Sequence, residues 1–384
     1  MTAPNPAAAP NPAPAEPVKE IDKLFHAMTK SKPMASDLHL KVGSPPLFRI
    51  SGQVVRAKLN PFNNEQIMAL VSSIMGPDQD KELEERGAAD FAYSVKGVGR
   101  FRINVYKQRS AISMAARRVQ TEIPTLEQLH LPAAVGKLSS FESGMALVAG
   151  VTGSGKSTTL AAVIQLINQT MPVHVVTIEN PIEYLYKDDR AFINQREVGI
   201  DTPDFGNALR HVLRQDPDVI LVGEMRDGET IETALMSAET GHLVFGTVHS
   251  GSAAQTVGRV LDYFPPERHH QVRQLLYFNL RAVMVQKLLK GQTAEVPRVP
   301  AVELMFCNPS VKKAIYEKED NKLGDIIRSA KQEGMQDFNT SLMDLVKRGL
   351  VAEAVALENS PNPEQLQMNL KGIVLGTDRG MITG

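Results

Sequence analysis

The 384-residue chain contains a single cysteine, Cys307, so no internal disulfide and no four-cysteine zinc cluster can form within it. This favours a reducing compartment such as the cytosol. The formal net charge is only −1, so bulk electrostatics do not favour a nucleic acid or an anionic membrane as a partner. No apolar run approaches the ~20 residues that span a bilayer, and no basic segment followed by an apolar one begins the sequence. We therefore expect neither a transmembrane helix nor a secretory signal, and any membrane association should go through a partner.

What the chain does contain is a phosphate-loop pattern. Residues 150–158 read GVTGSGKST, which matches GxxxxGK followed by Ser or Thr. In this pattern the glycines let backbone N–H groups turn inward around a phosphate, Lys156 reaches the β- and γ-phosphates, and the Ser157 hydroxyl ligates Mg²⁺. We therefore expect ATP and Mg²⁺ as ligands, held by Thr152, Gly153, Ser154, Gly155, Lys156, Ser157 and Thr158.

The sequence around the loop favours this interpretation over a glycine-rich turn that binds nothing. Residues 145–149 are a short apolar run of strand length. Residues 157–168 carry Leu160, Val163, Ile164 and Ile167 at helical spacing. The loop is therefore predicted to lie where a strand leads into a helix N-terminus, which favours anions.

Length predicts two or three domains, and composition places their boundaries. We expect a disordered Pro/Ala tail over 1–17, a small α+β domain over 18–120, a linker over 121–144, a nucleotide-binding core over 145–290, a loop and helical region over 291–358, and a loose tail over 359–384. Within the core, strand candidates at 173–179, 219–223 and 242–247 alternate with helix candidates at 205–214 and 229–239. This order predicts an α/β fold with a mainly parallel sheet, and ligand chemistry at the carboxyl ends of its strands.

Two acidic residues follow apolar strand candidates. Glu224 follows 219–223, where a carboxylate faces a bound nucleotide and its metal, and the alternative is an ordinary surface acid. Glu179 ends 173–179 and could hold or deprotonate a water near the γ-phosphate. Two histidines, His242 and His249, flank a third strand, and each could contact a phosphate or be structural; His249 at the carboxyl end is preferred for contact.

Two pairs of arginines suggest an anion nearby. If 100–107 and 111–119 form a hairpin turning at Arg109 and Ser110, Arg102 lies opposite Arg117, a destabilising pair unless an anion sits close to it. The alternative is a register shifted by one residue, with both arginines solvated. Arg210 and Arg214 lie four apart on a predicted helix, where either Asp216 and Asp218 or a triphosphate in a neighbouring subunit would compensate them.

These stretches together resemble a family. VTIENPIEY (176–184), NQREVG (194–199), ALRHVLRQDPDVILVGEMRD (208–227) and AETGHLVFGTVHS (238–250) follow the phosphate loop in the order found in secretion and pilus ATPases. SDLHL (36–40), GRFRINVYKQR (99–109) and FPPE (264–267) narrow the resemblance to the type IV pilus retraction, or PilT-like, ATPases that drive twitching motility. The match covers roughly residues 18–350.

The resemblance implies a cytoplasmic ATPase motor that forms a homohexamer and is recruited to an inner-membrane platform protein at the pilus base, where a paralogous retraction ATPase is a further partner. Each subunit would consist of a PAS-like α+β domain followed by a RecA-like P-loop ATPase domain. The resemblance also implies residue roles: Glu179 is the catalytic carboxylate, Glu224 the acid of the second nucleotide-binding motif and a Mg²⁺-side group, and His242 and His249 form a histidine box. Arg102, Arg117, Arg210 and Arg214 match arginines that approach the phosphates.

The sequence departs from the family pattern in two places. Asn180 stands where the family usually has aspartate, which removes a negative charge beside Glu179. The functional C-terminal helix of retraction ATPases is matched only loosely, by LGDIIR at 323–328. Alternatives are therefore a pilus-assembly or type II secretion ATPase, an accessory retraction paralogue, a nucleic-acid translocase, which the near-neutral charge opposes, and a nucleotide switch that does not hydrolyse.

Overall fold

The computed structural model describes residues 19–31, 34–50 and 52–373, and it divides into two compact units between Val119 and Gln120. Each unit has its own sheet and its own apolar core. The expected Pro/Ala tail at 1–17 and the last part of the expected loose tail lie outside the described residues.

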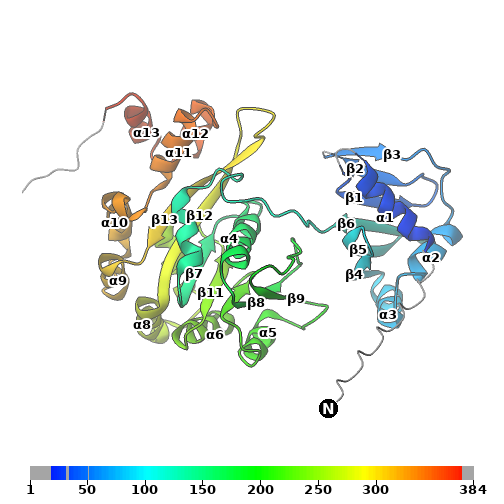
Figure 1. The fold of residues 1–384 in the computed structure, drawn as a ribbon, viewed down its shortest axis with the longest axis horizontal. Helices are drawn as coiled ribbons and strands as arrows, with labels where there is room; N and C mark the ends of the chain where they lie inside the picture. Colours follow the sequence, from blue (N-terminus) through cyan, green and yellow to red (C-terminus); the bar gives the residue numbers. More distant parts are fainter. Residues whose placement is uncertain (1–18, 32–33, 51, 374–384) are drawn as a thin grey trace, which may run out of the picture. The chain divides into compact units, whose positions relative to one another are not determined.

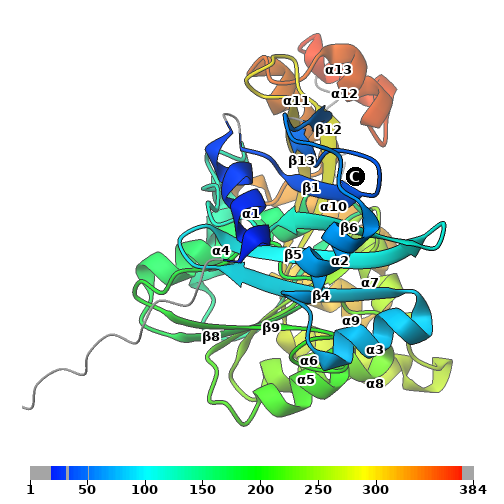
Figure 2. The same ribbon diagram turned by 90° about the vertical axis from the view of Figure 1, so that its right-hand side faces the viewer.

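The first unit is one antiparallel sheet of six strands in the order β3-β2-β1-β6-β5-β4. The strands are β1 (Asp37–Lys41), β2 (Leu47–Ile50), β3 (Gln53–Arg56), β4 (Ala88–Val95), β5 (Gly99–Gln108) and β6 (Ala111–Arg118). Three helices accompany them: α1 (Glu20–Lys30), α2 (Asn64–Ser72) and α3 (Pro77–Arg86). Figure 2 shows the three helices on the viewer's side of this sheet.

The side chains along each strand point alternately to the two faces of the sheet, and the apolar ones gather on the face that the helices cover. Phe101, Ile103 and Val105 of β5 point into the core, where they pack with α1 residues such as Phe25 and Met28. The residues between them, Arg102 among them, lie on the other face. The result is a half-covered antiparallel sheet.

The predicted hairpin register is confirmed. Ile103 lies opposite Ala116, Val105 opposite Met114 and Arg102 opposite Arg117. The turn residues Arg109 and Ser110 have φ values of 50° and 61°, so both central positions take the left-handed conformation of a type I′ turn without glycine.

The second unit is built on a seven-stranded sheet in the order β13-β12-β7-β11-β10-β8-β9. All neighbouring pairs are parallel except β12 and β13, which are antiparallel. The strands are β7 (Gly144–Ala149), β8 (His174–Glu179), β9 (Phe192–Glu197), β10 (Val219–Val222), β11 (Leu243–Val248), β12 (Leu280–Lys290) and β13 (Arg298–Phe306). This is the α/β arrangement that the sequence predicted.

Helices lie on both faces of this sheet (Figure 1). One face, which includes Ala146 and Val148 of β7, packs against α4 (Lys156–Thr170) and the 3₁₀ segment η1 (Ala133–Ser140). The other face, which includes Met145 and Leu147, packs against the helices that follow α4 as far as α8. These are α5 (Phe205–Val212), α6 (Gly228–Glu239), α7 (Ala253–Leu261) and α8 (His269–Asn279).

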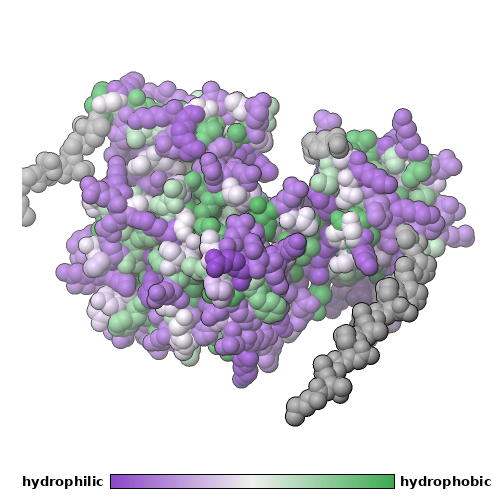
Figure 3. All heavy atoms as spheres, in the orientation of Figure 1, coloured by the Kyte–Doolittle hydropathy of each residue, from purple (hydrophilic) through white to green (hydrophobic). Residues whose placement is uncertain are grey.

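The chain beyond β13 is mostly helical. Its helices are α9 (Pro309–Tyr316), α10 (Leu323–Ser329), α11 (Phe338–Lys347), α12 (Glu353–Asn359) and α13 (Pro363–Leu370), with the short 3₁₀ segments η3 (Asp320–Lys322) and η4 (Lys331–Glu333) among them. Their apolar residues join the core formed by α5 to α8. A further 3₁₀ segment, η2 (Pro266–Arg268), lies earlier in the chain, between α7 and α8. On the face seen in Figure 3, polar residues surround separate apolar patches.

Three parts of the sequence-based organisation need correction. The region expected to be loop and helix after residue 290 begins with the expected loop, over 291–297, but continues into β13, which pairs along its length with β12. Helix α13 lies in the segment expected to be loose. Helix α5 ends at Val212, so Arg214 lies beyond it, and the helical like-charge argument for Arg210 and Arg214 does not apply.

Candidate nucleotide site

The loop over 150–155 connects the carboxyl end of β7 to α4, as predicted. Residue Gly155 is the N-cap of α4 and supplies no side-chain cap to the first turn. The first N–H groups of the helix are therefore not capped by that residue, and they form the positive end of a 15-residue helix. This is the geometry that binds a phosphate.

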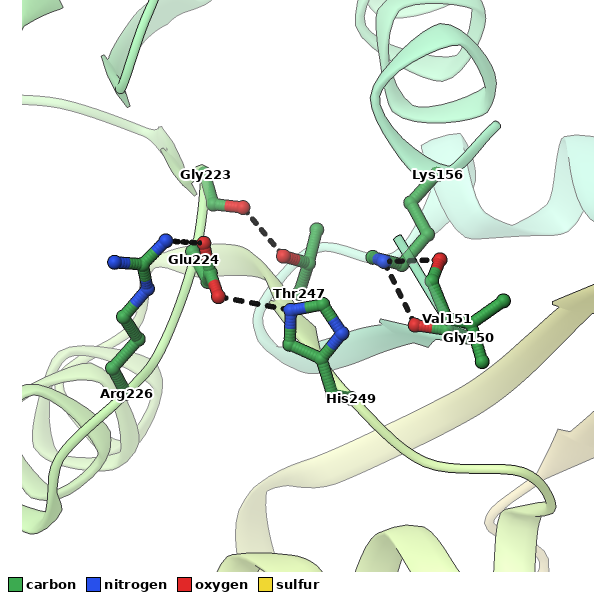
Figure 4. A network of polar contacts seen from close by, with 8 residues as sticks. All are labelled: Gly150, Val151, Lys156, Gly223, Glu224, Arg226, Thr247 and His249. Carbon is green, nitrogen blue, oxygen red and sulfur yellow. Dashed lines mark hydrogen bonds and ion pairs between the residues drawn. The ribbon is translucent and has the colours of Figure 1, made fainter. Parts of the chain in front are cut away.

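The Lys156 side chain is buried, with 9 % of its surface exposed. Its Nζ donates hydrogen bonds to the carbonyl oxygens of Gly150, at 2.8 Å, and Val151, at 3.1 Å (Figure 4). Burial lowers the pKa of the ammonium, and the negative charge of Glu224 opposes that shift. An anion placed against Lys156 would favour its charged form.

A cavity of about 500 Å³ opens beside the loop. The loop contributes Thr152, Gly153, Gly155, Lys156, Ser157 and Thr158 to its lining. The carboxyl ends of β8, β10 and β11 contribute Glu179, Glu224 and His249. Parallel strands bring these separate segments to one edge of the sheet, which is where such folds bind ligands.

Glu179 is held in one orientation by two donors. Its Oε1 accepts a hydrogen bond from Thr177 Oγ1 at 2.7 Å and another from Gln195 Nε2 at 3.1 Å. Burial raises the pKa of Glu179, and these two hydrogen bonds partly offset the rise. A partly desolvated carboxylate with a raised pKa suits a general base.

The carboxylate of Glu224 contacts two side chains that line the cavity, Arg226 and His249. Its Oε2 lies 2.5 Å from Arg226 Nη2, and its Oε1 lies 2.9 Å from His249 Nε2 (Figure 4). The hydrogen bond from Arg226 lowers the pKa of Glu224, burial opposes it, and the contact with His249 lowers it further. Glu224 is therefore an ionised carboxylate near neutral pH, and it lines the same cavity as Lys156.

His242 is not brought to this cavity. It precedes β11 at the amino end of the strand, and its Nδ1 lies 2.8 Å from the carbonyl oxygen of Ser237 in α6. The expectation that His242 helps to bind the nucleotide therefore fails within one subunit, because parallel strands place it at the edge of the sheet away from the phosphate loop.

The predicted arginines lie outside the cavity lining. Arg210 pairs with Glu229 at the start of α6, and not with Asp216 or Asp218. Asp218 instead accepts a hydrogen bond from the backbone N–H of His174. Arg214 is exposed.

In the first unit, Arg102 is exposed and Arg117 is paired. The Nε of Arg117 lies 2.8 Å from Oδ1 of Asp37, a buried carboxylate directly opposite it on β1. The anion predicted to lie near Arg102 and Arg117 is thus the carboxylate of Asp37, which pairs with Arg117.

Sequence reasoning missed several residues of the site. Arg226 and Arg298 line the cavity, and so does Tyr184, whose hydroxyl donates to Thr158 Oγ1 at 3.2 Å. Arg226 could have been found, because it follows Glu224 by two residues at a strand's carboxyl end. Arg298 could not, because β13 itself was not predicted.

The residues present fit a nucleoside triphosphate with Mg²⁺. Oxygen ligands suit Mg²⁺, which retains waters and phosphate oxygens as partners and needs few protein groups. The exposed Ser157 and the ionised Glu224 supply such oxygens at the cavity. Among the described residues, no group of three or more His, Cys, Asp or Glu side chains is arranged to hold a metal without a ligand's help.

The chain is similar to secretion and pilus proteins in comparisons with known sequences. Residues 18–358 match the family model described as "Type II/IV secretion system protein". The chain is 43% identical over 334 residues to the type IV pilus retraction ATPase PilT of Pseudomonas aeruginosa, an alignment that covers 87% of this chain and 96% of the relative. It is 36% identical over 352 residues to the type IV pilus ATPase PilU of the same organism, which covers 92% of this chain and 91% of the relative.

Among solved structures, the fold is similar to a crystal structure of the pilus retraction motor PilT with bound ADP. The TM-score is 0.82 at 43% sequence identity, and the match covers 91% of this chain and 99% of that chain.

Proposed function

The chain belongs to the type II/IV secretion system protein family, and from this premise we propose that it is an ATP-hydrolysing motor that powers type IV pilus retraction. One observation carries the catalytic part of the proposal. A phosphate-loop lysine, Lys156, and a half-buried carboxylate with a raised pKa, Glu179, line the same cavity. The similarity to the PilT relatives supports retraction as the work done.

In the proposed reaction, the N–H groups of the loop and Lys156 hold the β- and γ-phosphates. Glu179, oriented by Thr177 and Gln195, accepts the proton of the attacking water. Ser157 and Glu224 would hold Mg²⁺, which neutralises phosphate charge when it is bound. His249 positions Glu224 through their hydrogen bond, and it contacts the nucleotide from the same edge of the sheet.

The positive charges that stabilise the phosphates during hydrolysis would also come from arginines of the first unit and of neighbouring subunits. We propose a homohexamer in which Arg210 and Arg214, and from the first unit Arg102 and Arg117, approach the phosphates of a nucleotide bound across a subunit boundary. Arg210 would leave Glu229 to do so, an exposed pair with 50% and 66% of the two side chains accessible that costs little to break. His242, distant from its own cavity, would act only at such a boundary.

Hydrolysis would then change the arrangement of the two units, and the motion would pass to an inner-membrane platform protein at the pilus base. Among residues 19–31, 34–50 and 52–373, no helix has the length and apolar character to cross a bilayer. In this proposal the motor works in the cytoplasm and reaches the membrane through its partner.

A second candidate function is an accessory retraction ATPase, because the chain is also similar to a second type IV pilus ATPase, PilU. In that case the chain would assist a separate retraction motor and would depend on it. Catalysis at the site would be the same, so the site does not separate the two functions.

Deletion of the gene, scored by electron microscopy for surface pili and by twitching on agar, tests the proposal. A retraction motor predicts excess pili and no twitching, restored by the wild-type gene but not by Lys156→Ala. Bald cells would overturn retraction in favour of assembly. Excess pili only when a second retraction gene is also deleted would identify the accessory function.

A further inference from the structure

Gln286 lies in the middle of β12, next to the strand that leads into the phosphate loop. The register pairs Val285 of β12 with Ala149, the last residue of β7. Gln286 therefore runs alongside the first residue of the loop. Its side chain is 2 % exposed, which is uncommon for a glutamine and requires that its amide be hydrogen-bonded.

Both ends of that amide bond to the phosphate-loop region. Nε2 donates to the carbonyl oxygen of Ser154 at 2.7 Å, and Oε1 accepts from Thr159 Oγ1 at 2.8 Å. One residue thus connects the loop to the first turn of α4. Ser154 O can only accept, so the NH₂ end of the amide must face it.

The fit between Gln286 and the loop is tight at two glycines. A Cβ on Gly150, where φ is +146°, would lie 2.5 Å from the backbone oxygen of Gln286. A Cβ on Gly155, where φ is +90°, would lie 2.7 Å from Nε2 of Gln286. The backbone and the side chain of the same residue therefore limit where the two ends of the loop can lie.

The hydrogen bond from Gln286 to the Ser154 carbonyl also affects which backbone groups of the loop face a phosphate. A loop that binds an anion must present N–H groups to it and keep carbonyl oxygens turned away. The bond from Gln286 holds the Ser154 carbonyl toward β12. At the start of the loop, Nζ of Lys156 donates a hydrogen bond to the Gly150 carbonyl oxygen.

We infer that Gln286 is a positioning residue for phosphate binding, because its amide holds the loop in the shape that receives the β-phosphate. It touches no substrate. This inference rests on the proposed function, since it specifies how the same ATP site is preorganised.

The test compares ADP dissociation constants, measured by titration calorimetry on the full-length protein, and steady-state ATPase kinetics. Gln286→Met keeps the length of the side chain and removes both polar groups. We expect ADP to bind about tenfold more weakly, equivalent to about 1.4 kcal/mol, with the KM for ATP raised by a similar factor and kcat changed by less than about threefold. Gln286→Glu should bind ADP more weakly still, because a carboxylate would face the Ser154 carbonyl.

A matched control lies in the same helix. Asn168 is fully buried at the other end of α4, where its side chain donates to the Lys187 carbonyl oxygen at 2.8 Å and accepts from Asp189 N at 3.1 Å. Asn168→Leu should lower the melting temperature without changing the ADP dissociation constant. A merely structural role for Gln286 would reduce the fraction of active protein, which lowers kcat and leaves KM unchanged.

ADP binding by Gln286→Met within twofold of wild type, or an equal loss in Asn168→Leu, would overturn the inference. If Gln286→Met does not fold, Thr159→Val carries the test, because it removes one hydroxyl at constant shape and should weaken ADP binding about threefold; an unchanged constant would again overturn the inference. A wild-type protein that binds no ADP would instead refute the proposed function.

Discussion

Asp37 and Arg117 lie directly opposite each other on β1 and β6, with Oδ1 of the carboxylate 2.8 Å from Nε of the guanidinium. Arg49 lies opposite Asp37 on its other side, and its Nε is 3.7 Å from Oδ2. Arg102 lies opposite Arg117 on β5. One buried carboxylate therefore pairs with two arginines, Arg117 and Arg49, within a row of four residues that crosses four strands.

Replacing this carboxylate should destabilise the first unit. Although burial alone would raise it, the pKa of Asp37 lies below the usual aspartate value of 3.8 because Ser36 and Arg117 donate hydrogen bonds to its charged form. Its contribution to stability is then fully present above pH 3.8 and is lost as the pH falls through the lower folded-state pKa. We expect Asp37→Asn to cost about 1–3 kcal/mol at pH 7 in urea unfolding followed by circular dichroism, and less in strong acid.

The control for Asp37→Asn is an exposed pair in the same unit. Lys81 and Glu85 are 3.9 Å apart, with 70% and 63% of their side chains exposed. Glu85→Gln should change the free energy of unfolding by less than about 0.5 kcal/mol. Equal effects of the two substitutions would contradict the role given to Asp37.

The rate of hydrolysis should depend on the ionisation of Glu179. Burial raises its pKa, and only the carboxylate accepts a proton, so kcat should rise with pH on the acidic side of the profile. Thr177 Oγ1 donates to this carboxylate and stabilises its charged form. Thr177→Val should therefore move the acidic limb of kcat to higher pH with KM for ATP unchanged, and a limb that stays in place would argue against Glu179 as the base.

An ion pair between buried Arg273 and half-buried Asp320 should hold η3 to α8. Arg273 of α8, 7 % exposed, donates through Nη1 and Nη2 to the carboxylate of Asp320, at 2.8 and 2.5 Å, and through Nη1 to the carbonyl oxygen of Ile315 at 2.6 Å. Asp320→Ala leaves the guanidinium buried without its counter-ion. We expect a loss of about 3–5 kcal/mol in the free energy of unfolding, measured by denaturant titration.

The exposed pair of Arg348 and Asp344 provides the comparison for Asp320. Its atoms are 3.1 Å apart and its side chains are 43% and 60% exposed. Asp344→Asn should cost less than about 1 kcal/mol, and a loss as large as that of Asp320→Ala would mean that burial does not govern these pairs.

If a neighbouring subunit supplies Arg210 to the nucleotide site, two inactive variants should restore ATPase activity when they are mixed. Lys156→Ala cannot bind the phosphates, and Arg210→Ala retains its own loop. If Arg210 acts across a subunit boundary, mixing the two inactive proteins should restore part of the ATPase activity, because some boundaries combine an intact loop with an intact arginine. Mixtures no more active than the separate proteins would place Arg210 outside the reaction.

Local signals made much of this structure predictable. The phosphate loop lies between a strand and a helix because an apolar run precedes it and helical spacing follows it. The hairpin register came from pairing Ile103 with Ala116, which buries one face, and that register alone placed Arg102 opposite Arg117. Both depend on residues close together in the chain.

What the sequence did not predict depends on contacts between distant residues. Asp37 is separated from Arg117 by most of the first unit, and nothing local marks it as the counter-ion. Strand β13 was not predicted; it contains Pro300, and because β13 is an edge strand the missing N–H is tolerated there. Gln286 lies within an apolar run, and only the packing of β12 against β7 shows what its amide binds.

The central claim is that ATP bound by Lys156 is hydrolysed with Glu179 as the base. Steady-state phosphate release by the wild type and by Glu179→Gln, with ADP affinity measured on both, tests it most directly. We predict turnover by the wild type, a loss of about 10²–10⁴ in Glu179→Gln and the same ADP dissociation constant in both. Equal rates in the two proteins, or no release by a wild type that binds ADP, would contradict the claim.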